Sequence, residues 1–333
     1  MRKLYAMMLV GLLASVNTQA QTSPYLAAVD EYVPAPGQFI NTLPALSAND
    51  TPATAAQKCT ENLAGKMDGM VSLGAYGGYI TFHFDHPVVN VSGSKDLYLK
   101  GNAFPGSSEP GIVMVAQDTN GNGLPDDEWF ELSGSADVDS LGKVVYDYEI
   151  TYTKTGEKQD IAWTDNQGKQ GFVNRNQFHD QEYFPLWLGN SLTFKGTLLP
   201  PNYVNRGKNG GQFWYGNAFR EGYVDNQKDK ENSLFDLDNA VDQNRQPVHL
   251  RYVDFIRVYC ATNQMAGWLG EISTEFCGAE DLHPTVTSLE RIENSKAIVQ
   301  KIFTIDGKEI PSLQKGFNIV RFTNGKIQKI LKK

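Results

Sequence analysis

Short runs of alternating apolar and polar residues limit what this chain can fold into. In "YITFHFD" (residues 79–85) an apolar side chain occupies every second position, which is the period of a β-strand that buries one face. Similar runs return in "DLYLKG", "GIVMVAQ", "WFEL", "YDYEITYT" and "VDFIRVY", with Gly, Asn or Asp close to their ends. Of the 333 residues 41% are hydrophobic, which is enough for a buried core. The pattern predicts an all-β fold, a β-sandwich with long loops, over residues 21–283.

One segment departs from the strand pattern and predicts a helix. In "NDTPATAAQKCTENLAG" (residues 49–65) Thr51 suits the N-cap, Pro52 suits the first turn, and Gly65 suits the end. Cys59 would lie in this helix. The helix is expected to be the one clear exception in the body.

The first residues have the layout of a secretory signal peptide. Arg2 and Lys3 precede an apolar run over residues 4–16, and small residues lead to Ala20, the expected cleavage position. Removal of residues 1–20 would take the net charge from −8 to −10. Such an acidic protein is a poor candidate for nucleic acid, since phosphate binding needs clustered Lys and Arg. We therefore expect an exported protein, at the cell surface or outside the cell.

Three cysteines leave two alternatives open. Export permits disulfides, and Cys260 and Cys277 could form one pair, which would leave Cys59 alone. Three buried thiols are the other alternative.

A run of oxygen-bearing residues, "DTNGNGLPDDE" (residues 118–128), resembles the start of a calcium-binding loop. Calcium takes six to eight oxygen ligands, and such loops supply them from alternate positions around a glycine turn. The usual Glu at position 12 is Trp129 here, so the closing carboxylate would be Asp127 or Glu128, and the loop is not an EF-hand. A structural Ca²⁺ is expected here; the alternative is a metal-free turn whose Asn and Asp side chains cap backbone amides. The expected ligands are Asp118, Asn120, Asn122, Leu124 through its carbonyl, Asp126 and Glu128.

Aromatic residues in Gly- and Asn-rich segments are candidate ligand contacts. A flat ring offers a large apolar face at low entropy cost. The candidates are Trp187, Trp214, Tyr215 and Trp268. The alternative is that each ring fills the interior of the sandwich, and only for Trp214 do we favour binding.

Catalytic signatures are weak. Glu271 and Glu275 have the residue types of a glycosidase pair, but their spacing in sequence does not fix their separation in space. Asp236, Asp238 and Asp242 suit a capped turn better than a cation site. We identify no catalytic residue and expect a protein that is not an enzyme.

The composition becomes basic near residues 281–288, and a short-stranded tail follows. Its elements "IDGKEI" (305–310), "QKGFNIVRF" (314–322) and "GKIQKILKK" (325–333) resemble the type A C-terminal sorting domain of the type IX secretion system. The resemblance implies a separate β-module over residues 284–333 and delivery through the outer membrane. Taken without this resemblance, the sequence of the tail predicts three amphipathic strands around a DG turn.

The body, about residues 24–283, resembles a family of Bacteroidetes cell-surface proteins. The matching segments are "EYVPAPGQFINTLP", "SLGAYGGYITFHFDHPVVN", "GNAFPGSSEPGIVMVAQDTNGNGLPDDEWFEL", "WTDNQG", "FDLDNAVD" and "GWLGE". Members often accompany outer-membrane cobalamin transporters, so the resemblance implies non-catalytic capture of cobalamin or a related corrinoid, with a TonB-dependent transporter as partner. The order of strands is also similar to jelly-roll carbohydrate-binding modules. A glycan-binding module or a secreted glycoside hydrolase is therefore the alternative function.

Overall fold

The computed structural model describes residues 22–139, 142–284, 299–322 and 327–332. The predicted signal peptide, residues 1–20, lies outside the described residues. Across the described ranges, no helix combines the length and apolar character that crossing a membrane requires.

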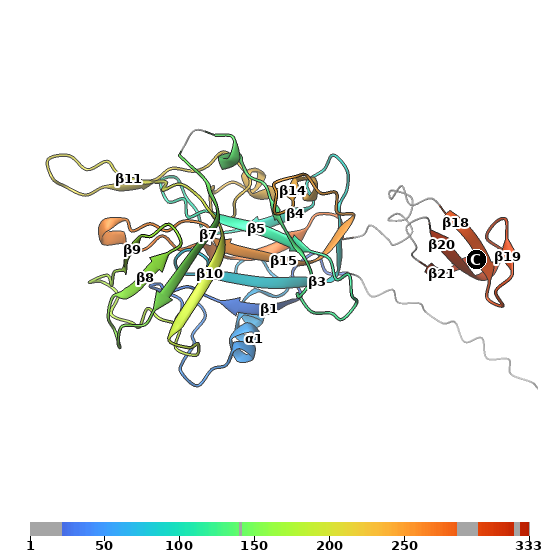
Figure 1. The fold of residues 1–333 in the computed structure, drawn as a ribbon, viewed down its shortest axis with the longest axis horizontal. Helices are drawn as coiled ribbons and strands as arrows, with labels where there is room; N and C mark the ends of the chain where they lie inside the picture. Colours follow the sequence, from blue (N-terminus) through green and yellow to red (C-terminus); the bar gives the residue numbers. More distant parts are fainter. Residues whose placement is uncertain (1–21, 140–141, 285–298, 323–326, 333) are drawn as a thin grey trace, which may run out of the picture.

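A six-stranded antiparallel sheet forms the centre of the body (Figure 1). In its middle, β15 (Tyr252–Cys260) pairs with β3 (Tyr79–Val89) on one side and with β5 (Gly111–Ala116) on the other. Ile256 of β15 therefore faces Phe82 and Val115. The expected strand runs at residues 79–85, 111–117, 129–132 and 253–259 all lie in this sheet. Its strands, in spatial order, are β1 (Ala28–Val33), β3 (Tyr79–Val89), β15 (Tyr252–Cys260), β5 (Gly111–Ala116), β6 (Trp129–Leu132) and β14 (Ala240–Val241).

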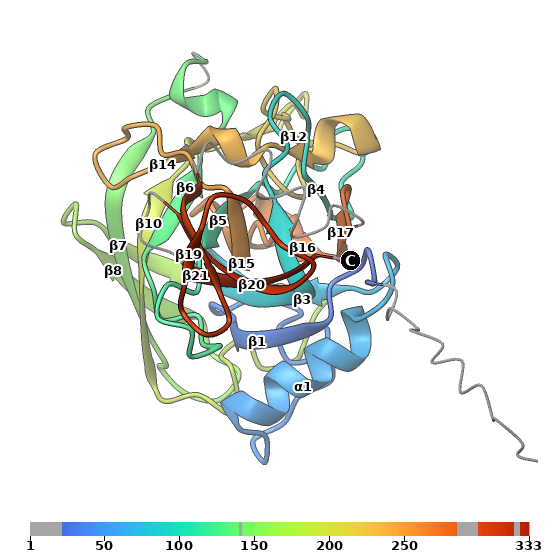
Figure 2. The same cartoon turned by 90° about the vertical axis from the view of Figure 1, so that its right-hand side faces the viewer.

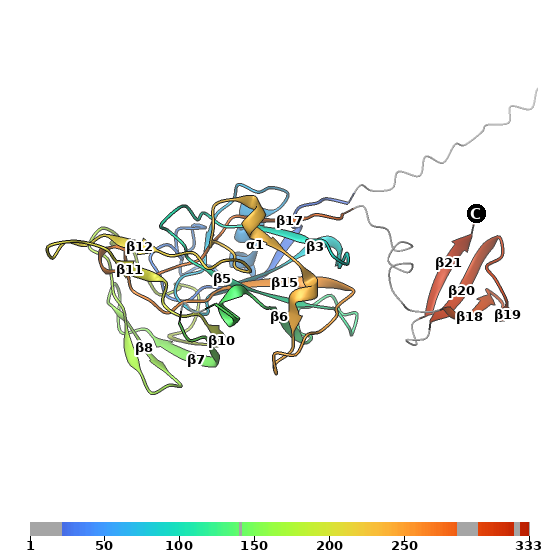
Figure 3. The same cartoon turned by 90° about the horizontal axis from the view of Figure 1, so that it is seen from above.

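Both faces of this sheet are buried, which divides the core in two. Ile80 and Phe82 of β3 belong to one apolar cluster, whereas Ile112 of β5 and Tyr259 of β15 belong to the other. The second cluster lies under a four-stranded sheet, which Figure 3 shows as a separate layer. Its strands are β10 (Ser191–Leu198), β7 (Val145–Thr153), β8 (Ile161–Asp165) and β9 (Gln170–Val173).

Short strands and the helix cover the other face. The sheet β13 (Leu234–Phe235), β4 (Leu97–Lys100) and β17 (Gly278–Asp281) lies there, together with the pair β16 (Glu275–Phe276) and β2 (Val71–Ser72). The predicted all-β sandwich is confirmed, and the covered second face adds a third layer to it.

The predicted helix is confirmed as α1, Pro52–Leu63. Thr51 caps it, because its hydroxyl accepts from the backbone N–H of Thr54 and the Thr54 hydroxyl accepts from the N–H of Thr51. α1 packs beside β1 (Figure 2), and Cys59 and Leu63 point into the core. Cys59, Cys260 and Cys277 are all free and buried, so the alternative of three thiols is the one that the structure shows.

The connections carry short elements of their own. A two-stranded hairpin of β11 (Tyr203–Asn205) and β12 (Trp214–Gly216) lies in the loop-rich segment that follows β10. Single-turn 3₁₀ helices occupy Ser135–Asp137, Lys230–Ser233, Leu237–Asn239 and Gly267–Leu269.

The two ends of the body lie together. The Thr22 hydroxyl donates to the carbonyl of Pro284 at 2.7 Å, and the Asp281 N–H donates to the carbonyl of Pro24 at 2.7 Å. Beside them the Leu26 N–H donates to the carbonyl of Ala279 at 3.2 Å.

The described tail has a sheet of its own, with four strands instead of the expected three. Its order is β19 (Glu309–Ile310), β18 (Val299–Thr304), β20 (Gly316–Phe322) and β21 (Ile327–Lys332). Gly307, of the expected DG turn, has φ +88° and joins β18 to β19. Among the described residues, no strand of this sheet pairs with a strand of the body.

We predict that residues 21–283 fold without the tail, because both core clusters lie within them. A protein ending at His283 should unfold cooperatively in a thermal melt followed by circular dichroism. A protein ending at Phe276, which lacks β17, is the control and should lose that transition. Insoluble or unfolded protein on truncation at His283 would show that the tail belongs to the core.

Candidate functional site

A cavity of about 360 Å³ opens between loops at one end of the body. It is lined by segments 38–43, 102–109 and 269–275, together with Met70 and Tyr203. Its volume falls in the range of roughly 300–1,000 Å³ that is usual for small-molecule sites. The lining combines aromatic rings with an unusual number of carboxyl groups.

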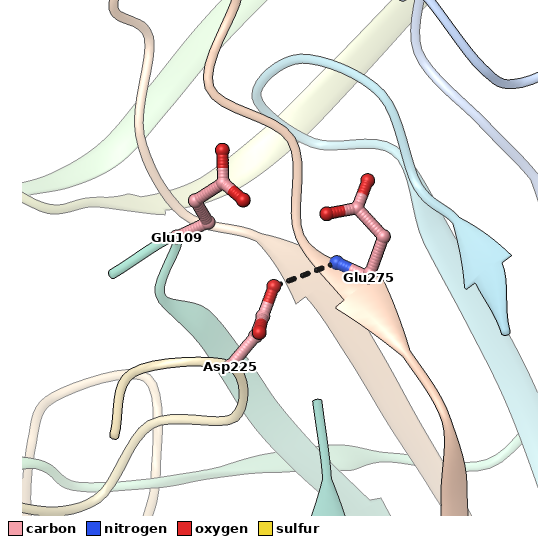
Figure 4. A group of neighbouring side chains, drawn as sticks. All are labelled: Glu109, Asp225 and Glu275. Carbon is pink, nitrogen blue, oxygen red and sulfur yellow. Dashed lines mark hydrogen bonds between the residues drawn. The ribbon is translucent and has the colours of Figure 1, made fainter. Parts of the chain in front are cut away.

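Three carboxyl groups from distant parts of the sequence meet beside this cavity. Glu109 precedes β5, Asp225 follows the bridge of Val224 to Gly111, and Glu275 begins β16. One oxygen of each lies within 4.8 Å of the others (Figure 4). We call these three residues the carboxylate triad.

Backbone hydrogen bonds fix the triad. The Asp225 carboxylate accepts from the N–H of Glu275 at 2.9 Å and from the N–H of Asn102 at 2.7 Å (Figure 4 draws the first of these). The N–H of Glu109 donates to the carbonyl of Asp225 at 2.8 Å. The three segments are thus joined through Asp225, whose own carboxylate is held by two backbone N–H groups.

The position of Asp225 has a local cost. Its φ is +55°, the left-handed region in which Asp is better tolerated than most residues. A Cβ on Gly101 would lie 2.4 Å from the Cβ of Asp225, so only glycine fits at that position. The positive φ of Asp225 and the glycine at position 101 therefore accompany the burial of this carboxyl group.

A fourth carboxyl group, that of Glu271, lines the same cavity and is 4% exposed. Its Oε1 accepts from the N–H of Gln38 at 2.5 Å, whereas Oε2 has no hydrogen-bond partner among the described residues. The Oε1 of Gln38, also a lining residue, has no such partner either. Two buried acceptors therefore lack donors at the cavity, which is costly unless something supplies them.

The charged side chains that line the cavity are all acidic. Of the described residues that line it, none is Lys, Arg or His. Burial raises the pKa of Glu271 to about 8 and that of Glu275 to about 7. Burial and the neighbouring charges of Glu275 and Asp225 also raise the pKa of Glu109, and burial followed by the charge of Glu275 raises that of Asp225. Glu109 keeps partial contact with solvent, which tempers its rise.

Small polar groups support these acids. The Ser72 hydroxyl lies 3.1 Å from the Oε1 of Glu275 and 2.9 Å from the Ser273 hydroxyl. These contacts favour the ionised form of Glu275 and oppose the effect of burial. The cavity can thus hold a proton, accept hydrogen bonds from a ligand, or bind a cation.

The predicted calcium loop lies between β5 and β6, away from the residues that line the cavity. The Asp118 carboxylate accepts from the N–H groups of Gly121, Asn122 and Gly123 at 2.7–3.1 Å. The side-chain amides of Asn120 and Asn122 donate to Asp126 at 3.0–3.2 Å. This is the geometry of the metal-free turn, although carboxylate lone pairs remain for an ion. Leu124 and Glu128 are exposed.

The four aromatic candidates fall into two places. Trp187 packs against the core cluster of Ile80 and stacks on Tyr32 at 5.9 Å, so this ring fills the interior. Trp214 packs against the cluster of Tyr203, Ala266 and Ile272, of which Tyr203 and Ile272 line the cavity. Tyr215 is covered by the guanidinium group of Arg206 at 3.5 Å.

The rim of the cavity is aromatic and exposed. Trp268, next to the lining residue Leu269, is 51% exposed, and Phe104, a lining residue, is 60% exposed. The structure therefore brings Trp214 and Trp268 beside the cavity and places Trp187 elsewhere.

Sequence reasoning missed Glu109 and Asp225 as site residues and gave little weight to Glu271 and Glu275. One signal was present: Glu271, Ser273 and Glu275 alternate along an extended segment, so that polar side chains share one face. All three are buried, although a buried strand face is normally apolar. No comparable pattern surrounds Glu109 or Asp225.

A scan against protein-family models and a search of curated proteins each return no match.

We predict that stability without divalent cations falls as the pH rises. The folded-state pKa of Glu271, about 8, exceeds its ordinary value of 4.5, so folding strengthens proton binding. Its contribution is complete below pH 4.5 and is lost as the pH approaches 8. In chelator, denaturant titrations at pH 5 and pH 8 should differ less for Glu271→Gln than for the unchanged protein. Glu157→Gln, an exposed control, should keep the full difference; an unchanged slope in Glu271→Gln would contradict the burial of an acid there.

Proposed function

We propose that the body is a non-catalytic binding module that captures a small ligand in the carboxyl-lined cavity. The observation that carries this proposal is the cavity of about 360 Å³ in which Glu271 Oε2 and Gln38 Oε1 lack partners among the described residues. Buried acceptors of this kind favour a ligand that brings N–H or O–H groups.

The rim adds a second requirement on the ligand. Exposed Phe104 lines the cavity, and exposed Trp268 adjoins the lining residue Leu269 in the sequence, so that both rings offer apolar faces to a ligand. A ligand with a broad face and donor groups at its edge would use both parts of the site. The captured molecule then places its donors in the cavity and its face on the rings.

Two ligand classes have this chemistry. A corrinoid carries carboxamide donors around a wide macrocycle, and the resemblance of the body to cobalamin-associated surface proteins supports it. A saccharide carries hydroxyl donors and an apolar ring face, and it fits within the cavity more completely than a corrin ring does. The corrinoid is our first proposal because two arguments, rim and resemblance, support it; the glycan is the alternative.

The setting that we propose for this capture is the cell surface. The signal-peptide pattern of residues 1–20 and the sorting-domain resemblance of residues 284–333 support export. A TonB-dependent transporter in the outer membrane is the proposed partner that would receive the ligand.

A hydrolase acting on glycans is the second candidate function. Glycoside hydrolysis needs one carboxylic acid and one carboxylate around the scissile bond. The raised pKa of Glu275, about 7, favours a group that can hold a proton at neutral pH, and other carboxyl groups stand beside it. Release of reducing sugar, abolished by Glu275→Gln, would establish this function in place of simple capture.

We propose that the loop of residues 118–128 binds a structural Ca²⁺. Asp118 lies at the centre of its hydrogen bonds, and Asp126 and Asp127 follow within the same loop. Rotation of the Asn120 and Asn122 amides would exchange their N–H groups for oxygens toward Asp126. An ion there would stiffen a loop that is otherwise held by its own side chains.

The ligand proposal predicts binding without turnover. In titration calorimetry the full chain should bind cobalamin and release it chemically unchanged, and a panel of oligosaccharides tests the alternative. Trp214→Ala should weaken binding by about 1–3 kcal/mol, because this ring packs against the cluster that contains the lining residues Tyr203 and Ile272. Phe172→Ala removes an exposed ring of β9 and serves as the control. Silence toward cobalamin together with a sugar signal would select the glycan, and silence toward both would sink the capture proposal.

The calcium proposal predicts stabilisation by the ion. An ion that binds only the folded state stabilises it by about 2.7 kcal/mol at a hundredfold excess over Kd. Chelation should therefore lower the melting temperature, and the decrease should be smaller in Asp118→Ala. The control is Asp229→Ala, at an acidic residue in another loop. Equal effects of chelator on the unchanged protein and on Asp118→Ala would leave only the metal-free turn.

A further inference from the structure

The carboxylate triad has the separations of a shared ion. Calcium lies 2.3–2.6 Å from its oxygen ligands, so two ligands on opposite sides of one ion stand up to about 5 Å apart. The oxygens of Glu109, Asp225 and Glu275 lie within 4.8 Å of one another. One ion can therefore contact all three without movement of the backbone.

The donor atoms are of one kind. Carboxylates form the triad, and the Ser72 and Ser273 hydroxyls and the Glu271 carboxyl group lie nearby. Oxygen ligands of this type select hard cations such as Ca²⁺ and Mg²⁺, whereas softer metals prefer nitrogen or sulfur. These oxygen ligands favour Ca²⁺ over Mg²⁺, because Ca²⁺ tolerates irregular coordination geometry whereas Mg²⁺ requires an octahedral arrangement.

The charge of the site calls for compensation. Several carboxyl groups share the cavity, and its described lining has no basic side chain to offset them. Buried carboxylates of like sign are unfavourable unless they are protonated, paired or bound to a metal. A divalent cation would offset two of these charges at once.

Independent support comes from outside the triad. Glu271 is 4% exposed and lines the cavity, yet its Oε2 has no hydrogen-bond partner among the described residues. Asp225 also joins the backbone segments of the triad, because its carboxylate accepts the N–H of Glu275 and its carbonyl accepts the N–H of Glu109. A cavity that holds this group of carboxyl oxygens together with an unpartnered buried oxygen has the donor atoms of a cation site.

We propose that Glu109, Asp225 and Glu275 bind a hard divalent cation, with Ca²⁺ preferred, at the wall of the cavity. Glu271, whose Oε2 has no hydrogen-bond partner among the described residues, lines the same cavity. This site is distinct from the predicted loop of residues 118–128, and it does not depend on the capture of any organic ligand. It also gives the cavity a second way to hold hydroxylated molecules, through oxygen atoms bound to the ion.

Calorimetry with Ca²⁺ alone tests the site in the full chain. Asp118→Ala is the background, because it disables the loop between β5 and β6 and isolates the cavity. We expect this protein to bind one Ca²⁺, and Glu109→Gln in the same background to weaken that binding about tenfold or more. Glu109 is chosen because it is partly exposed and glutamine keeps its shape, whereas Asp225→Asn would lose an acceptor of two backbone N–H groups. Glu157→Gln, at an exposed loop residue, should leave the affinity unchanged.

Terbium emission provides a measurement that does not rely on removing a carboxyl group. Tyr203 lines the cavity, so Tb³⁺ bound there should be excited through its ring, and Ca²⁺ should displace the signal. In the Asp118→Ala background, Tyr203→Phe should reduce this emission while Ca²⁺ affinity is retained. Absence of Ca²⁺ binding to the Asp118→Ala protein, or equal affinity with and without Glu109→Gln, would overturn the proposal. Because no organic ligand is present, this outcome is separate from failure of ligand capture.

Discussion

The pairing of β15 with β3 and β5 is the interaction on which the rest of the body depends. It creates a sheet whose alternate side chains enter two different cores, with Ile80 and Phe82 on one side and Ile112 and Tyr259 on the other. Burial of each apolar face stabilises by roughly 25 cal/mol per Å² removed from water, so neither face can be left open. The layers above and below the sheet are the consequence.

Both faces of the central sheet are covered by other layers, and the cavity lies among the loops that connect the strands. Glu109 enters from the start of β5 and Glu275 from β16, while Asp225 is reached through the bridge of Val224 to Gly111. These loops have rigid anchors on the sheets, which is how flexible connections come to present fixed side chains. Burying acids in this place opposes stability, and such conflicts usually mark function. The cavity is therefore the part of the body in which buried acids oppose the stability of the fold.

Much of the fold was predictable from the sequence because its signals are local. Apolar residues recur at every second position in the strands of the central sheet. Thr51 and Pro52 mark the start of α1. The third layer was not predictable, since β4 and β17 are short and their pairing joins residues far apart in sequence.

The same limit applies to the site. Glu109 and Asp225 are single acids in loops, and only the folded chain brings them to Glu275. The loop predicted to bind calcium and the aromatic candidates could be picked out because each is a local pattern, yet Trp187 shows that an aromatic residue flanked by turn residues can belong to the core.

The neighbouring ends of the body also determine how it responds to force. Thr22 is bonded to Pro284, and Pro24 and Leu26 are bonded to Asp281 and Ala279. A pull applied between these two ends would open those few hydrogen bonds one after another, as a zipper opens, and would load the central sheet only after they had separated. Beyond those bonds, tension at residue 284 would pass along β17 to β16, whose Glu275 lines the cavity.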